Sequence, residues 1–123
     1  MADVHLSLGK LFLRLPGRQP DAIKEYEAVL RIRPDDFDAH NNLGAAFMEV
    51  PGHLPDAISQ FQEAVSLRSD SSAAHANLAI AFSKDPGHLQ EAIAEFEAAY
   101  RINPDPAIRG TIAYLRNRVA ARN

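Results

Sequence analysis

The sequence contains no cysteine and no tryptophan among its 123 residues. Without cysteine, a disulfide framework and any site that needs a thiolate are excluded. No apolar run approaches the roughly 18 residues that a membrane-spanning helix needs, so we expect no membrane partner. A basic segment followed by an apolar stretch, as in a signal peptide, is also missing at the N-terminus. We therefore expect a cytoplasmic protein, provided that the chain is not excised from a longer one.

The chain also lacks a strong charge of one sign, since its formal net charge is −3. Residues 1–34 and 105–123 are net basic, whereas residues 35–104 are net acidic. A nucleic-acid groove needs a continuous basic surface, so this pattern tells against a nucleic-acid partner. Hydrophobic residues make up 46% of the chain, which is enough apolar material for a folded core.

Three similar segments fill most of the chain. They begin at Pro16, Pro51 and Pro86, so each starts 35 residues after the one before. A constant period of this length is typical of stacked supersecondary units. The sequence therefore predicts a helical repeat array.

The apolar spacing within each unit is that of a helix. Positions i, i+3, i+4 and i+7 of the first helix of the second unit carry His40, Leu43, Gly44 and Phe47. The same face recurs as His5, Leu8, Gly9 and Phe12, and as His75, Leu78, Ala79 and Phe82. Each first helix is expected to end before a proline, and the glycine after it permits the turn (Pro16-Gly17, Pro51-Gly52, Pro86-Gly87).

The second helices are expected to begin at Pro20, at Pro55 and near Gln90. Polar side chains take their outward positions, namely Lys24, Glu25, Glu27, Ser59, Gln60, Gln62, Glu95 and Glu97. Small residues allow close approach of paired helices, namely Gly9, Gly44, Ala79, Ala22, Ala57 and Ala92. Pro34 and Pro104 end helices, and the next ones can be capped by Asp35 or Asp36, by Asp70 and by Asp105.

The two ends of the array differ. Residues from Pro106 to about Ala121 predict one more helix with a narrow apolar stripe, Ile108, Ile112, Leu115 and Val119. Its arginines (Arg109, Arg116, Arg118, Arg122) fit a solubilising terminal cap. The first helix has almost no polar side, because residues 4–15 include Val4, Leu6, Leu8, Leu11, Phe12, Leu13 and Leu15.

The recurring residues resemble the tetratricopeptide repeat (TPR). The resemblance rests on Leu8-Gly9, Phe12, Ala22-Ile23, Tyr26 and Pro34, on Leu43-Gly44, Phe47, Ala57-Ile58 and Phe61, and on Leu78-Ala79, Phe82, Ala92-Ile93, Phe96 and Pro104. Histidine stands where the family often has tryptophan, Ser69 replaces a closing proline, and the repeat is 35 residues long instead of 34. The Pro-Gly turns also resemble those of bacterial arrays that follow a glycosyltransferase region.

The resemblance implies an all-α fold, a right-handed α-solenoid of three helix-turn-helix units and a capping helix. We expect one domain over residues 1–123, with repeats at about 2–35, 36–70 and 71–105 and the cap at about 106–121. The first helices of the family line a concave groove that binds peptides or protein segments. One branch of the family grips a terminal carboxylate, and its residue set falls here on Leu6, Lys10, Asn42, Ala73 and Asn77, of which only Asn42 has the expected type.

The candidate binding surface lies along these first helices. It comprises Lys10, Leu13 and Arg14 in the first unit, Asn41, Asn42, Ala45, Met48 and Glu49 in the second, and Asn77, Ile80, Ser83 and Lys84 in the third. Asn42 and Asn77 are one period apart, and an amide can pair with a peptide backbone of any sequence. Lys10 and Arg14 favour a segment with acidic character. Against this stands the interpretation that the asparagines are solvated or bond within the array.

Other polar residues fit structural roles better than chemistry. His5, His40 and His75 belong to different repeats without carboxylates at ligand spacing, which favours packing between helices over a metal site. His53 and His88 lie in turns and are expected to face solvent, and Glu91 and Glu95 form a solvated helix face. Because no nucleophile, phosphate-loop or metal motif occurs, we expect no enzymatic activity and no cofactor.

Three functions remain open. The first is a protein-interaction module that uses the groove. The second is a self-associating array, or homo-oligomer, that uses the apolar residues 4–15. The third is an accessory region of a larger bacterial enzyme such as a glycosyltransferase.

Overall fold

The computed structural model describes residues 1–122 and contains, over that range, α-helices and one short 3-10 helix. Contacts between Cα atoms divide the chain into two compact units, which are described separately. Unit 1, Met1–Leu67, holds α1 (Ala2–Leu13), α2 (Gln19–Ile32), α3 (Phe37–Met48) and α4 (Leu54–Leu67). Unit 2 begins at Arg68 and holds α5 (Ser72–Ser83), the 3-10 helix η1 (Pro86–His88), α6 (Leu89–Ile102) and α7 (Pro106–Arg122).

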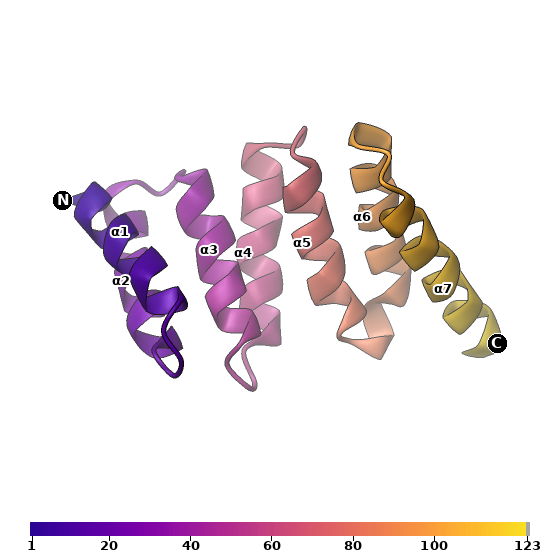
Figure 1. Cartoon of the computed structure of the whole chain (residues 1–123), viewed down its shortest axis with the longest axis horizontal. Coiled ribbons are helices and arrows are strands. Elements are labelled where there is room, and N and C mark those ends of the chain that lie inside the picture. Colours follow the sequence, from indigo (N-terminus) through magenta and orange to yellow (C-terminus); the bar gives the residue numbers. More distant parts are fainter. Residues whose placement is uncertain (123) are drawn as a thin grey trace. The chain divides into compact units, whose positions relative to one another are not determined.

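Helices that follow one another in the sequence pack against one another within each unit (Figure 1). In unit 1, α2 contacts both α1 and α3, and α3 contacts α4. In unit 2, α6 contacts both α5 and α7. The predicted all-α class is therefore confirmed. The boundaries predicted near residues 35, 70 and 105 fall between helices, while the assignment of residues 1–123 to a single domain stays a prediction.

The helix starts and turns follow the proline, glycine and capping signals with two corrections. Asp36 accepts a hydrogen bond from the backbone N–H of Ala39, as expected of a cap, but α5 is capped by Ser71 instead of Asp70. Gly17 and Gly52 have positive φ angles of 76° and 86°. Gly87 does not, because the third turn forms η1 and the Asp85 carboxylate accepts from the Gly87 N–H.

The core of unit 1 contains two contacts, each between a glycine of one helix and an aromatic ring of the following helix. Tyr26 of α2 is fully buried and forms a cluster with Ala22, Leu43 and Ala46. A Cβ atom placed on Gly9 would lie 2.7 Å from Cε1 of Tyr26, and one on Gly44 would lie 2.6 Å from Cε1 of Phe61. These glycines therefore let α1 and α3 seat directly on an aromatic ring of the following helix.

The three repeat histidines form hydrogen bonds between the first helix and the second helix of each pair. This corrects the expectation that these histidines only pack between helices and have no carboxylate nearby. His5 Nδ1 lies 3.0 Å from Glu25 Oε1, and His75 Nδ1 lies 2.6 Å from Glu95 Oε1. His40 Nδ1 lies 2.7 Å from Gln60 Oε1. Glu25, Gln60 and Glu95 thus point toward the first helix, not outward as predicted, and Glu95 is no part of a solvated face.

The histidine of the third repeat, His75, has a second contact through its other ring nitrogen. His75 Nε2 lies 2.8 Å from the Ser69 carbonyl oxygen, so both ring nitrogens face oxygens that can only accept. The ring of His75 thus links Glu95 of α6 to the backbone that precedes α5. In the second repeat His40 makes the two equivalent contacts, with Gln60 Oε1 at 2.7 Å and with the Pro34 carbonyl oxygen at 2.7 Å.

The C-terminal helix covers α6 through its apolar stripe. Ile112 and Leu115 of α7 are buried, and Ile108 and Val119 are half-buried beside them. The arginines do more than solubilise: Arg109 donates to the Tyr100 hydroxyl, Arg116 to the Glu97 carboxylate, and Arg122 to the Pro86 carbonyl. The hydrogen bond to Tyr100 raises the pKa of Arg109 further above its usual value.

Candidate functional site

The predicted binding residues fall on the first helix of each pair. Unit 1 contributes two stretches: Lys10 and Leu13 on α1 with Arg14 as its C-cap, and Asn41, Asn42, Ala45 and Met48 on α3 with Glu49 as its C-cap. Helices α1 and α3 contact each other, so unit 1 brings these stretches to neighbouring helices. Unit 2 contributes Asn77, Ile80 and Ser83 on α5, with Lys84 as its C-cap.

Lys10 and Arg14 supply the positive charge of the unit 1 surface. They are one helical turn apart and both exposed, and within residues 1–122 neither takes part in an ion pair. Two unpaired cations at this spacing attract a carboxylate-bearing segment, and the attraction weakens as salt rises. The C-terminal end of the α1 dipole lies beside them and offsets part of that charge.

Asn42 is the amide on this surface that stays open to a ligand. It is half-buried on α3, and its side chain forms no hydrogen bond with any other part of residues 1–122. Asn41 and Asn77 already interact within the chain, so the two asparagines one period apart, Asn42 and Asn77, are not equivalent. An open amide can both donate to and accept from an extended backbone.

Three other predicted residues are already engaged. Leu13 packs against the buried cluster around Tyr26 and Leu43 and so belongs to the edge of the core. Glu49 accepts a hydrogen bond of 3.0 Å from the Gln19 amide of α2. The Ser83 hydroxyl donates to the Ile80 carbonyl at 2.6 Å. Ile80 itself is 42% exposed and is the apolar anchor available on α5.

The turn histidines do not simply face solvent, which corrects part of the prediction. His53 stacks on Phe47 with ring centroids 5.5 Å apart, and His88 lies against Phe82 at 5.3 Å. Each also bonds a carboxylate three residues on, Asp56 and Glu91 respectively. The bond to Glu91 raises the pKa of His88 above its usual value, with Asp85 adding to the effect. Glu91 is therefore paired too, and not simply solvated.

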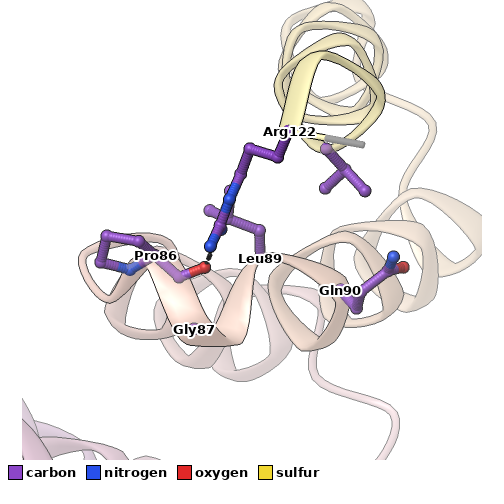
Figure 2. A pocket seen from close by; sticks show the side chains of 6 residues that line it. Pro86, Gly87, Leu89, Gln90 and Arg122 are labelled. Atoms are coloured by element: carbon purple, nitrogen blue, oxygen red, sulfur yellow. Dashed lines mark hydrogen bonds between the residues drawn. The ribbon is translucent and has the colours of Figure 1, made fainter.

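A hollow that sequence reasoning missed lies between α7 and the start of α6 (Figure 2). Its volume is about 270 Å³, and it is lined by Pro86, Gly87, Leu89, Gln90, Val119 and Arg122. The Arg122 guanidinium reaches across it to the Pro86 carbonyl. The hollow is thus part of the attachment of the terminal helix to unit 2.

Among the described residues, no group of three or more histidine, aspartate or glutamate side chains is placed to hold a metal ion. No helix of residues 1–122 is long and apolar enough to cross a membrane.

Two family profiles match the sequence over most of its length. A profile described as TPR repeat matches residues 16–50, and one described as tetratricopeptide repeat matches residues 52–106. The chain belongs to the tetratricopeptide repeat family. It is a TPR scaffold, and the family seen in the residue pattern is confirmed.

Solved structures of other proteins share the fold. The first TPR of Spaghetti (RPAP3), bound to an HSP90 peptide SRMEEVD, has a TM-score of 0.87 and 19% identity, covering 97% of this chain and 93% of that one. MamA from Desulfovibrio magneticus RS-1 has a TM-score of 0.87 and 19% identity, covering 98% and 67%. A comparison with curated proteins found no match.

An O-GlcNAc transferase mutant from Thermobaculum terrenum is also similar. The TM-score is 0.75 and the identity 25%, over 85% of this chain. The TPR chain spans 19% of the length of that transferase.

Proposed function

We propose that this TPR protein is a protein-interaction module that holds an acidic peptide or protein segment along its first helices. The observation that carries the proposal is the pair of exposed, unpaired cations Lys10 and Arg14 on α1, together with the open amide of Asn42 on α3, a helix that contacts α1. The cations would attract carboxylates, and the amide would bond the backbone of the segment.

The apolar part of the surface complements the charges. Met48 is half-buried on α3 of unit 1, so it can take an apolar side chain of a segment bound there, and Ile80 is a separate exposed apolar residue on α5 of unit 2. A ligand with alternating acidic and apolar residues would use both features. Leu13 and Glu49, which are engaged within unit 1, contribute shape more than direct contacts.

The structural neighbour Spaghetti was solved with the peptide SRMEEVD, which contains three acidic residues. This supports an acidic segment as the ligand class. The clamp for a terminal carboxylate is nevertheless incomplete in this chain, because Leu6 and Ala73 occupy two of its positions. We therefore propose recognition of side-chain carboxylates within a segment, not of a free C-terminus.

The likeness to the O-GlcNAc transferase favours a second candidate function. This chain corresponds to about a fifth of that transferase, so an array of this size can be one region of a much longer polypeptide. In this alternative the same first-helix surface would present a protein substrate to a catalytic region elsewhere in the polypeptide.

The test starts with a display selection of random peptides of about 12 residues against the chain (such a peptide is about 40 Å long when extended). Binding of the selected peptides is then measured by fluorescence anisotropy. We expect acidic sequences, and we expect Lys10→Glu with Arg14→Glu to weaken binding by at least about tenfold.

The matched control reverses two exposed cations elsewhere. Lys24 and Arg31 lie on α2 and are exposed, so Lys24→Glu with Arg31→Glu makes the same change in net charge away from the first helices. Equal losses in both variants would mean a general charge effect and would overturn the proposed site. Asn42→Ala should weaken binding of every selected peptide alike, because the amide reads backbone and not sequence.

A further inference from the structure

The first helix exposes an apolar face that the rest of the chain does not cover. Val4, Leu8 and Leu11 on α1 are 55%, 37% and 51% exposed, and Leu15 in the following turn is 40% exposed. Exposed apolar residues scattered singly need no explanation, but Val4, Leu8 and Leu11 lie at spacings of 4 and 3 residues on one side of α1, and Leu15 follows 4 residues later in the turn after it. The group is called the α1 seam below.

The second repeat shows what such a face does. The residues 35 positions after Val4, Leu8 and Leu11 are Ala39, Leu43 and Ala46, which are at most 2% exposed. Leu43 and Ala46 cluster with Ala22 and Tyr26 of α2, and Ala39 clusters with Val29 of α2. On α3, therefore, these positions dock another helix. On α1 the same positions are bare, and Leu8 does not take the buried place that the repeat pattern predicts for it.

The side chains of the α1 seam are larger than those with which α3 contacts α2, so the seam fits a helix of different shape from α2. Where α3 has two alanines that admit a close neighbour, α1 has the larger Val4 and Leu11. Spacings of 4, 3 and 4 are those of a and d positions in a heptad, where leucines of two similar helices interdigitate. A second copy of the seam itself offers that complement.

The charges on α1 indicate the orientation of such a pair. The first turn carries Asp3 and the last turn carries Lys10, with Arg14 at the C-cap. Antiparallel pairing brings the acidic end of one helix beside the basic end of the other and opposes the two helix dipoles. Parallel pairing would bring like charges together. Asp3 already pairs with Arg33 at 2.9 Å, and both side chains remain about half or more exposed.

We propose that the chain forms a homodimer in which the α1 seams of two copies pack antiparallel about a two-fold axis. Such an interface is isologous: Val4 of one copy faces Leu15 of the other, and Leu8 faces Leu11. The proposal goes beyond peptide binding and does not depend on it, because the side chains that pack in the interface are Val4, Leu8, Leu11 and Leu15, and the charges at the ends of α1 set only the orientation.

Sedimentation velocity of the whole chain over a wide concentration range tests the dimer. The wild type should pass from monomer to dimer, and Leu8→Glu with Leu11→Glu should raise the dissociation constant by at least about tenfold. A matched control, Ile32→Glu with Ile102→Glu, replaces exposed isoleucines on α2 and α6 and should leave dimerisation unchanged. Circular dichroism of each variant checks that the helices persist.

Two outcomes of this experiment overturn the proposal. A wild type that stays monomeric at every concentration would assign the α1 seam to a helix of another protein or another segment. A dimer that survives Leu8→Glu with Leu11→Glu would place the interface elsewhere. Peptide binding by the same variants, measured by fluorescence anisotropy, would fail separately if only the proposed binding site were wrong.

Disulfide trapping tests the orientation, since the chain has no cysteine of its own. Residues 4 and 13 are already about 14 Å apart along α1 and residue 15 lies beyond its end, whereas a disulfide needs Cα atoms within about 7 Å. A mixture of Val4→Cys and Leu15→Cys chains should therefore cross-link readily under mild oxidation, and each alone should not. Rapid cross-linking of Val4→Cys with itself would contradict the antiparallel arrangement.

Discussion

Gly44 of α3 faces the ring of Phe61 on α4 so closely that a Cβ atom at residue 44 would lie 2.6 Å from Cε1 of the ring. The contact is surrounded by buried residues, with Ala57 fully buried on the same helix as Phe61. Adding a methyl group here forces the helices apart or the ring out of its place. The close approach of paired helices in this protein therefore depends on the absence of a single side chain.

We predict that Gly44→Ala lowers the free energy of unfolding by about 1–3 kcal/mol, because overpacking outweighs the gain in helix propensity. Gly110→Ala is the control, since Gly110 lies within α7 and a Cβ atom added there would meet no neighbouring atom within 4 Å. That change should raise stability by about 0.5–1 kcal/mol. Urea unfolding of both variants checks the pair, and equal effects would contradict the account.

Tyr26 carries a buried hydroxyl without a hydrogen-bond partner in the described chain. Phenylalanine stands at the equivalent positions 61 and 96. We predict that Tyr26→Phe keeps or raises the free energy of unfolding, by up to about 1–2 kcal/mol, because it removes an unsatisfied polar atom without changing shape. A loss of more than about 1 kcal/mol in urea unfolding would show that the hydroxyl has a partner.

The same residue predicts a pH dependence. Burial raises the pKa of Tyr26 from 10.0 to about 12, so the unfolded chain loses this proton first as pH rises. The stability that goes with the neutral phenol is complete below pH 10 and declines between pH 10 and 12, by about 3 kcal/mol in all. The wild type should therefore lose more stability between about pH 9 and about pH 11.5 than Tyr26→Phe does. Parallel curves for the two proteins would rule this out.

His75 and Glu95 provide a further prediction. Their side chains are 12% and 25% exposed, so the pair is partly shielded from water. A double-mutant cycle with His75→Ala and Glu95→Ala should give a coupling of about 1–2 kcal/mol at neutral pH. The change Glu95→Gln, which copies the Gln60 of the second repeat, should cost less than Glu95→Ala. Additive single effects would mean that the two side chains act independently.

Two variants of α7 compare the apolar and the ionic contributions to the attachment of this helix. Leu115 is 3% exposed, so Leu115→Ala should cost about 2–4 kcal/mol. The Arg116–Glu97 pair is exposed on both sides, at 59% and 37%, and Arg116→Ala should cost about 0–0.5 kcal/mol. Thermal unfolding of the two variants compares them directly. A larger cost for Arg116→Ala would show that the ion pair, and not the stripe, attaches α7.

The sequence was sufficient for the helices, because prolines, glycines and apolar periodicity act locally. The hydrogen bonds of His5, His40 and His75 were not predicted. In every repeat the partner lies 20 residues after the histidine, which is a regular spacing, but neighbours at i and i+4 do not include it. Within the candidate site, the positions of Lys10 and Arg14 at the end of α1 could be predicted from the sequence, and their role in binding stays a prediction. The engagement of Glu49 by Gln19 was not, because that contact depends on how α2 lies beside the end of α3.

The choice of Ser71 over Asp70 as a cap shows a similar limit. Both residue types cap helices well, and they are adjacent in sequence. Which one accepts from the N–H of Ala74 depends on where the chain leaves the preceding turn. Local propensity therefore places a cap within a residue or two and does not decide between neighbours.

The central claim is that Lys10 and Arg14 hold an acidic segment, and the salt dependence of binding tests it most directly. For a selected acidic peptide, the dissociation constant should rise steadily with sodium chloride in the wild type and in Lys24→Glu with Arg31→Glu. In Lys10→Glu with Arg14→Glu, binding should be weak and should not weaken further as salt rises, because salt then screens a repulsion. A salt dependence identical in all three proteins would contradict the claim.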